Sequence, residues 1–264
     1  VYQALHGAGR AVGWGSVMDI RVTVWNENRV NEKTRGMYEV YPEGIHGRLR
    51  EIFEGAGFSV TTALLDEPKC GLTDATLART DVLVYWSHLA REEVPDSLAE
   101  KIAEAVNRGM GFIPLHSAHM AKPFVRLMGT TCTLSWRESH DRELLWSVCP
   151  GHPIAEGIPP VTELLPEEMY GEYFDIPAPE ETVFTSWFSG GEVFRSGVCY
   201  RRGRGRIFYF QPGHETYPTY YVPEIERILV NAVRWAAPAY REESTRTCRY
   251  VEPLVSSREE DGHG

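Results

Sequence analysis

The sequence predicts an α/β protein built around a mostly parallel sheet. Three short apolar runs, at residues 81–86, 111–115 and 206–210, have the length and composition of strands that are buried on both faces. The segments 45–53 and 225–233 carry apolar residues at helical spacing instead. Strands that alternate with amphipathic helices along one chain are typical of βαβ units, which place their strands in parallel.

The first βαβ unit covers residues 20–64. Residues 20–25 alternate apolar and polar side chains, several of them β-branched, which predicts a strand. A polar loop leads to the stripe at Ile45, Leu49, Ile52 and Phe53, and Gly55 and Gly57 end that helix. Residues 58–64 then form the second strand.

The next helix begins at Pro95 and Asp96 and ends at Gly109, which leads into the strand at 111–115. Pro114 stands within that strand. Because proline has no N–H to donate to a ladder, we expect the last two or three residues of the run to have left regular pairing.

Residues 130–200 have a different character from the rest of the chain. Short aromatic and β-branched runs are separated there by clusters of proline and glycine, which predicts a loop-rich β extension of mixed or antiparallel pairing. Regular α/β sequence resumes at residue 206 and ends with the helix at 225–233.

Amino-acid composition limits the kinds of molecule that this protein is expected to bind. The chain has 27 Lys and Arg residues against 37 Asp and Glu residues, a net charge of -10, which disfavours nucleic acid and anionic membranes and favours a neutral small molecule. No run approaches the roughly 20 apolar residues of a membrane-spanning helix. We expect a cytoplasmic protein with a disordered arm or a tag at 1–17, one domain at 18–240 and a flexible tail at 241–264.

Polar side chains follow four of the predicted strands. They are Glu27, His88, His116 with Ser117, and His214 with Glu215. Ligands of open parallel sheets bind beyond the carboxyl ends of the strands, so we expect the three histidines to converge there. Three imidazoles with nearby carboxylates ligate a divalent metal such as zinc or act as general acids and bases. A buried, hydrogen-bonded structural histidine is the alternative for each one.

Further candidates lie near this edge. His119 and Tyr217 follow two of the histidines, His46 begins the first helix, and Glu168 and Tyr170 belong to an acidic and aromatic segment at 167–174 suited to packing a sugar face. The alternatives are a helix-start residue for His119, a surface position for His46, core packing for Tyr217, and a solvated acidic loop for the segment. No role is expected for His140, His152, His6 or His263.

Five short motifs, in this order, resemble the ThuA-like (trehalose utilisation) family. They are Tyr41-Pro42-Glu43-Gly44-Ile45-His46, Trp86-Ser87-His88, Leu115-His116-Ser117-Ala118-His119, Glu167-Glu168-Met169-Tyr170 and Phe210-Gln211-Pro212-Gly213-His214-Glu215. The resemblance covers roughly residues 19–238. It implies a class I glutamine amidotransferase-like fold, a flavodoxin-like three-layer sandwich, and a link to the catabolism of trehalose or related disaccharides.

The same resemblance argues against glutamine hydrolysis. Amidotransferases of this fold carry a nucleophilic cysteine in the turn that here holds His116 and Ser117, and Ser117 lacks the GxSxG setting that activates a serine. Cys132 lies well past that turn. The fold is therefore expected to remain while the parent chemistry is lost.

Two hypotheses for function follow. In the first, the chain is an enzyme acting on a sugar or keto-sugar, with His88, His116 and His214 as metal ligands or proton carriers, Glu168 and Glu215 moving the proton, and Glu27, His46, Ser117, His119, Tyr170 and Tyr217 binding substrate. In the second, it is a non-catalytic sugar-binding or regulatory protein whose histidines donate hydrogen bonds to hydroxyls. A homodimer is expected only because such assemblies are common.

Overall fold

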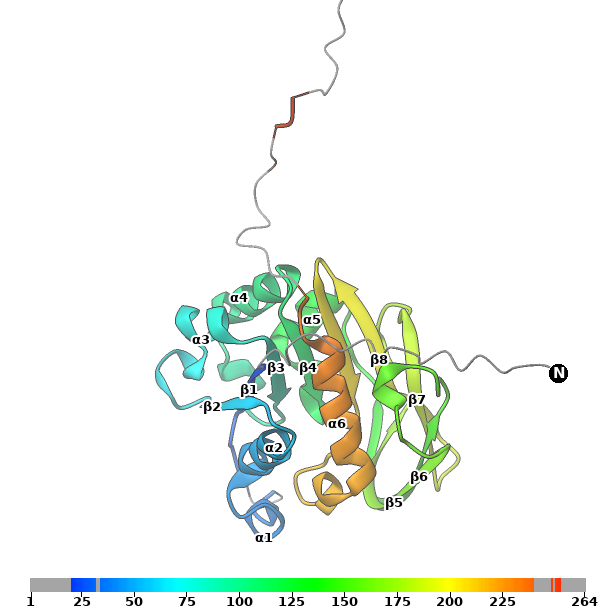
Figure 1. Cartoon of the computed structure of the whole chain (residues 1–264). Coiled ribbons are helices and arrows are strands. Elements are labelled where there is room, and N and C mark those ends of the chain that lie inside the picture. Colours follow the sequence, from blue (N-terminus) through cyan, green and yellow to red (C-terminus); the bar gives the residue numbers. More distant parts are fainter. Residues whose placement is uncertain (1–19, 32–33, 240–247, 249, 253–264) are drawn as a thin grey trace, which may run out of the picture.

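The structure is a computed structural model that describes residues 20–31, 34–239, 248 and 250–252 (Figure 1). The expected arm at 1–17 lies outside the described residues, as does most of the expected tail at 241–264. The boundaries of the expected domain at 18–240 therefore remain a prediction.

Nine strands within the described residues form a single sheet. They are β1 (Arg21–Asn26), β2 (Ser59–Leu64), β3 (Val82–Trp86), β4 (Gly111–Leu115), β5 (Ser135–Ser147), β6 (Val161–Gly171), β7 (Glu181–Phe188), β8 (Val193–Arg202) and β9 (Gly205–Phe210). The α-helices are α1 (Met37–Val40), α2 (Gly44–Gly55), α3 (Asp74–Arg79), α4 (Asp96–Asn107), α5 (Lys122–Met128) and α6 (Pro223–Ala236). Short 3₁₀ turns are η1 (Pro68–Gly71), η2 (Arg91–Glu93), η3 (His116–Met120), η4 (Pro153–Ala155) and η5 (Pro218–Tyr221).

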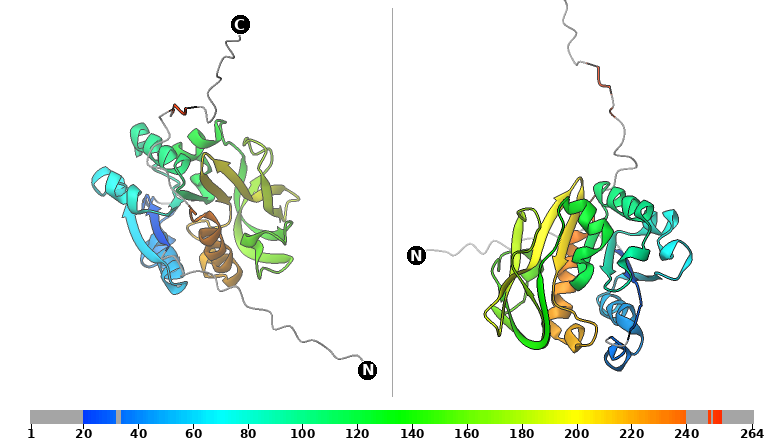
Figure 2. Two further views of the ribbon diagram at one scale, coloured as in Figure 1. Left: turned by 45° about the horizontal axis from the view of Figure 1, so that its top comes forward. Right: turned by 180° about the vertical axis from the view of Figure 1, so that it is seen from behind.

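The strand order is β2-β1-β3-β4-β9-β8-β7-β5-β6. The first five strands pair in parallel and are called here the parallel half; counted along the chain, their order is that of flavodoxin-like sheets. The remaining strands, β5 to β8, pair in antiparallel fashion and are called the antiparallel half, which joins the parallel half at β9. The two halves lie side by side in both views of Figure 2.

The α/β fold class and its three layers are confirmed, but one detail of the prediction is wrong. The sheet is divided between parallel and antiparallel pairing rather than mostly parallel. The predicted β extension is present, with antiparallel pairing and long connections at 148–160 and 172–180, and its longest strand, β5, runs for 13 residues. Proline and glycine in this region end long strands at turns and bulges, and they do not interrupt the sheet.

Helices cover both faces of the parallel half and build two cores. One core packs Leu77 of α3, Leu98 of α4 and Phe124 of α5 against the sheet. The other packs Leu49 of α2 and Ile225 of α6 against the opposite face. This packing accounts for the apolar stripes read from the sequence and leaves the carboxyl ends of the strands uncovered by helices.

The strand that carries Pro114 stays paired to its end. Pro114 lies opposite Tyr85 and Leu115 lies opposite Trp86 in the ladder with β3, so the expected early departure from pairing is wrong. The consequence is that the turn after β4 begins directly at His116.

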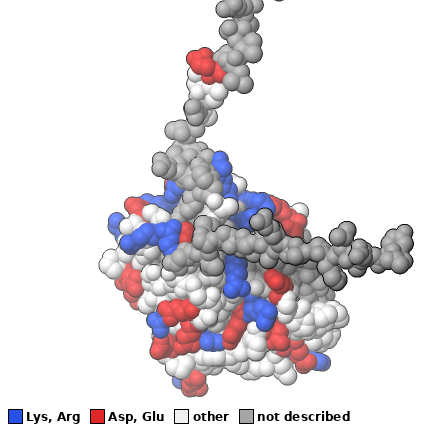
Figure 3. All heavy atoms as spheres, viewed as in Figure 1, with Lys and Arg blue, Asp and Glu red and all other residues white. Residues whose placement is uncertain are grey.

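Within the described residues, no helix is long and apolar enough to cross a membrane. On the face drawn in Figure 3, acidic and basic side chains are intermixed.

Candidate functional site

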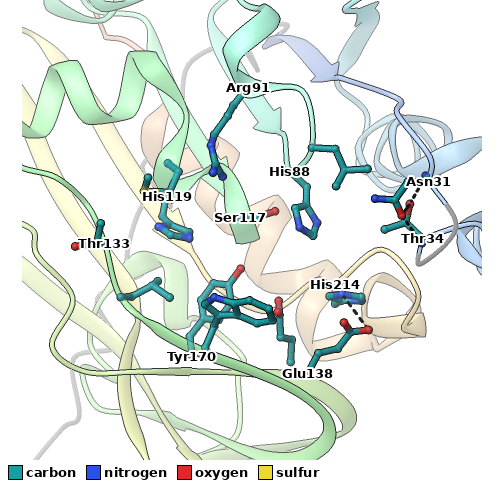
Figure 4. A pocket seen from close by; sticks show the side chains of 15 residues that line it. Asn31, Thr34, His88, Arg91, Ser117, His119, Thr133, Glu138, Tyr170 and His214 are labelled. Carbon is teal, nitrogen blue, oxygen red and sulfur yellow. Dashed lines mark hydrogen bonds and ion pairs between the residues drawn. The ribbon is translucent and has the colours of Figure 1, made fainter.

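A pocket of about 580 Å³ opens where the parallel and antiparallel halves meet (Figure 4). Its wall takes His88, Ser117, His119 and His214 from turns that follow β3, β4 and β9. The antiparallel half contributes a second group of side chains from within its strands. These are Trp136, Glu138, Glu168 and Tyr170.

His116 occupies the sharp turn after β4. Its φ of 52° lies in the left-handed region, which costs free energy for a residue with a side chain and is typical of functional turns. The ring is fully buried, stacked between Trp86 and Tyr170 at centroid distances of 6.3 and 5.1 Å. His116 is therefore rigidly held, but it lies one layer behind the pocket wall.

The pocket-facing partner of His116 is Glu168. Its Oε2 lies 3.0 Å from His116 Nε2. Burial disfavours the charged imidazole, but Glu168 and two further carboxylates outweigh it and raise the pKa of His116 to about 9. Burial likewise opposes ionisation of Glu168, yet the adjacent His116 cation lowers the pKa of that carboxyl. Both pKa shifts favour a buried imidazolium that holds an ionised carboxylate at the pocket wall.

A second pair has the opposite orientation. Glu215 is buried, and its Oε1 accepts a hydrogen bond from Nδ1 of His88 at 2.9 Å, while the His88 side chain is 30% exposed at the wall. Burial works against the charge on each partner. The contact with Glu215 nevertheless raises the pKa of His88, and the surrounding imidazoles lower the pKa of Glu215 to about 2. In this pair the histidine faces the pocket and the carboxylate lies behind it.

His214 is placed by a turn that Gly213 and Glu167 shape. Gly213 has a φ of 132°, and a side chain there would collide with the Tyr220 hydroxyl. The buried Glu167 carboxylate accepts hydrogen bonds from the N–H groups of Gly213 and His214 and from the Thr219 hydroxyl. Glu167 thus fastens the His214 turn to β6.

Hydrogen-bond partners assign the tautomers of these rings. Nδ1 of His116 donates to the Gln211 carbonyl and Nδ1 of His119 donates to the Cys132 carbonyl, at 2.9 and 2.7 Å. His214 differs, because its Nδ1 accepts the N–H of Thr216 and its Nε2 therefore carries the proton. The neutral ring of His119 therefore keeps Nε2 as an acceptor, whereas the protonated rings of His88 and His116, and the ring of His214, present N–H donors at Nε2.

His119 and Ser117 add neutral groups to the wall. Burial, with the nearby His116 and Arg91 cations, lowers the pKa of His119 to about 4, so its ring is uncharged at neutral pH. The Ser117 hydroxyl donates to the Ser87 carbonyl at 2.9 Å and keeps its lone pairs for a ligand. Burial raises the pKa of the Cys132 thiol to about 11, which disfavours a thiolate nucleophile.

Candidate metal-ligand atoms gather at one place in the described part of the chain. One side-chain donor atom each from His116, His214 and Glu215 lies within 4.8 Å of the other two. The predicted set was His88, His116 and His214. The three rings are close, with centroids 6.4 Å apart for His88 and His214 and 5.5 Å apart for His116 and His214, but Glu215 takes the place of His88 in this cluster.

Three residues expected to bind substrate do not line the pocket. Glu27 accepts hydrogen bonds from the N–H groups of Leu89 and Ala90, so it fixes the loop after β3. His46 lies on α2, where burial and Arg50 lower its pKa. Tyr217 packs against the His214 ring at 4.7 Å and is buried behind it.

Sequence reasoning missed several residues of the wall. They are Asn31, Thr34, Leu89, Arg91, Met120, Thr133, Leu134, Trp136 and Glu138. The segment at 167–174 was also misread where a solvated acidic loop was allowed, since Glu167 and Glu168 are buried in β6. Only the pairing of adjacent glutamates with Tyr170 gave a signal for this side of the pocket.

Together these features define a flavodoxin-like α/β protein with a histidine and carboxylate pocket at the carboxyl ends of its parallel strands. The family model for ThuA, described as trehalose utilisation, matches residues 21–236, and the chain belongs to that family. A search of curated proteins found no significant match.

Solved structures with low sequence identity share the fold. A ThuA-like protein from Parabacteroides merdae is 18% identical, with a TM-score of 0.59 over 85% of this chain and 91% of its own. A ThuA-like protein from Bacteroides uniformis is 15% identical, with a TM-score of 0.61 over 86% and 95%. A Salmonella typhimurium protein described as cytoplasmic is 12% identical, with a TM-score of 0.52 over 83% and 99%.

Proposed function

We propose that this protein is an enzyme that moves a proton on a sugar or keto-sugar. The observation that carries the proposal is the opposite orientation of the two buried pairs. Glu168 faces the pocket with His116 behind it, and His88 faces the pocket with Glu215 behind it. One wall thus offers an ionised carboxylate and a protonated imidazole, the two groups that general acid–base catalysis requires.

The roles follow from the directions of the pKa shifts. Glu168 is the base that takes a proton from the carbon beside a carbonyl group, and His88 donates a proton or a hydrogen bond to the carbonyl oxygen. His116 and Glu215 act as positioning residues, since each touches its pocket-facing partner and not the pocket itself. In this assignment Glu168 keeps its expected role of moving the proton, whereas His116 and Glu215 do not carry the proton themselves.

The sugar part of the proposal rests on the wall chemistry and on the family description. Trp136 is 63% exposed at the pocket rim and offers a flat apolar face, as sugar-binding sites use. Nε2 of His119 and the Ser117 hydroxyl are free to accept hydrogen bonds from sugar hydroxyls. Trehalose or a related disaccharide and a cytoplasmic location are proposed on the family description and on the Salmonella typhimurium relative.

A divalent metal, with zinc as the first candidate, is proposed as a second component of the site. His116 and Glu215 have the orienting partners typical of metal ligands. Nε2 of His214 and Nε2 of His116, the latter in its ion pair with Glu168, each bear a proton that a bound metal would have to displace. A bound metal would supply Lewis acidity toward a substrate oxygen.

Proton exchange in heavy water tests the enzyme directly. The protein is incubated with trehalose and with trehalose oxidised to a ketone, and proton NMR follows the signal of the hydrogen beside the carbonyl group. We expect exchange with the keto-sugar, and a loss of about 10²- to 10⁴-fold in Glu168→Gln and in His88→Ala. His140→Ala is the matched control, since His140 is exposed and outside the pocket wall.

The same samples separate the remaining alternatives. Binding of the keto-sugar without exchange or product would favour the non-catalytic, sugar-binding hypothesis. Elemental analysis tests the metal: His116→Ala is expected to lose most of it, and His140→Ala to keep it. Equal metal content in both variants would contradict the proposed ligands. A homodimer stays a prediction, which the mass of the protein in solution will check.

A further inference from the structure

Arg91 is a charged side chain of the pocket that the acid–base chemistry does not use. It begins η2, five residues after the end of β3, and its guanidinium points into the pocket between the Ser117 and His119 side chains (Figure 4). The side chain is partly buried. Among the described residues, no carboxylate or other group forms an ion pair or hydrogen bond with it.

Two carboxylates that follow Arg91 in the chain and one at the pocket wall already have other partners. Glu93 forms an ion pair with Arg29 at 2.8 Å, and Glu92 lies 3.6 Å from the Lys122 ammonium. At the pocket wall, Glu168 is paired with His116. A partly buried guanidinium that has no counter-ion among the described residues is unfavourable, and its fixed fork of N–H donors matches the oxygens of a carboxylate or a phosphate.

The backbone that presents Arg91 is rigidly held. Glu27 accepts hydrogen bonds from the N–H groups of Leu89 and Ala90, directly before Arg91. The cation is thus placed before a ligand arrives, which lowers the entropic cost of binding. Its proximity to His119 is also visible in that ring, because the Arg91 charge contributes to the lowered pKa of His119.

The opposite side of the pocket has the other sign of charge. Glu138 and Tyr170 lie across from Arg91 in Figure 4, and the Glu138 carboxylate is 3.9 Å from His214 Nε2. An anionic group bound beside Glu138 would be repelled, whereas the same group beside Arg91 is attracted. This asymmetry gives a ligand one orientation, with its negative end at η2 and its hydroxyls toward β5 and β6.

From this arrangement we infer that the substrate is an acidic sugar derivative whose carboxylate or phosphate binds Arg91. The inference rests on the proposed sugar chemistry and replaces the neutral partner expected from composition. A net charge of -10 repels anions at long range, so a dedicated cation inside the pocket is what allows an anionic sugar to bind.

Calorimetric titration of the full-length protein with glucose, glucuronate and glucose 6-phosphate tests the inference. We expect at least one of the two anions to bind more tightly than glucose, and the preferred anion identifies the group. Arg91→Gln is expected to weaken that anion about 10- to 100-fold without changing glucose binding, and Arg91→Lys to restore part of the affinity. Arg79→Gln, an exposed position on α3, removes the same charge away from the pocket and is expected to change nothing.

Two outcomes would overturn the inference. One is that glucose binds the unmodified protein as tightly as both anions do. The other is that the Arg91→Gln and Arg79→Gln variants bind the anions equally well. Neither outcome touches the proposed acid–base function, which the exchange of hydrogen in a neutral keto-sugar measures independently. If Glu168→Gln loses that exchange while Arg91→Gln binds the anions as well as before, the proposed enzyme function would be supported and the acidic substrate would be contradicted.

Discussion

The two halves of the sheet contribute to the pocket in different ways. The parallel half supplies His88, His116 and His214 from turns that follow strand ends, where side chains of neighbouring strands meet at one edge. The antiparallel half supplies Glu168 and Tyr170 from within β6, where only the strand register decides which side chains reach the pocket. The positions of the histidines in this site therefore follow from the order of the parallel strands. The positions of Glu168 and Tyr170 follow from how β6 pairs and packs.

The His116–Glu168 pair connects the two halves, and breaking it is expected to have the largest effect. Glu168→Gln leaves a fully buried imidazolium without its counter-ion, so we expect the free energy of unfolding to fall by about 3–5 kcal/mol. Urea unfolding measures the loss. Glu163→Gln, on the same strand but in a half-exposed pair with Arg142, is the control and should cost far less, because water screens that pair.

A double-mutant cycle sharpens this test. If the two side chains act as one unit, His116→Gln combined with Glu168→Gln will cost clearly less than the sum of the two single changes. Additive losses would show that the halves are held together by other contacts and that the pair is not coupled.

The second prediction concerns the antiparallel half alone. Hydrogen bonds from Arg137 outweigh burial and, with Ser139 and Ser189, lower the pKa of Asp141 to about 2. Because this folded-state pKa lies below the unfolded value of about 3.9, the stabilisation is complete above that pH and is lost as pH falls through about 2. Asp141→Asn is therefore expected to cost about 1 kcal/mol at pH 6, since Arg137 is 37% exposed.

Urea unfolding of the Asp141→Asn variant at pH 6 and near pH 2 measures this difference. The gap between the variant and the unmodified protein should close at the lower pH. A gap of constant size would mean that Asp141 acts through packing and not through its charge.

The smallest expected effect lies in the parallel half. Thr73 caps α3 by accepting the Thr76 N–H at 3.1 Å, and Thr73→Ala should cost about 0.5–1 kcal/mol. Because α3 lies at the far edge of the sheet from the pocket, ligand affinity should not change. A change in affinity, measured by titration beside the melting temperature, would show that this edge communicates with the site.

The parallel half could be predicted from the sequence more fully than the antiparallel half. Apolar strands and the polar residues after them could be read directly, so the strand-end histidines were placed together from their positions alone. Strand β6 was missed because Pro166, Glu167 and Glu168 resemble a loop in sequence. Burial of those carboxylates depends on partners at residues 116, 213 and 214, far away along the chain.

Arg91 illustrates a second reason why residues of the pocket could not be predicted from the sequence. A single arginine in a polar turn has no periodicity or spacing that separates it from a solvated surface charge. A ligand-binding role for Arg91 can be inferred only from the structure, in which the neighbouring carboxylates are paired with other residues. Glu27 and His46 lie outside the pocket wall for different reasons: Glu27 holds the backbone of the loop after β3, and His46 lies on α2.

The Glu27 clamp on Leu89 and Ala90 has a consequence for how this pocket changes over evolutionary time. His88 and Arg91 stand on either side of the two clamped residues, and neither side chain takes part in the clamp. A single codon change at position 91 can therefore alter which ligand is selected, while the backbone that positions His88 stays unchanged. The residue that selects the ligand, Arg91, and a residue of the proposed chemistry, His88, thus lie on one loop but can change independently of each other.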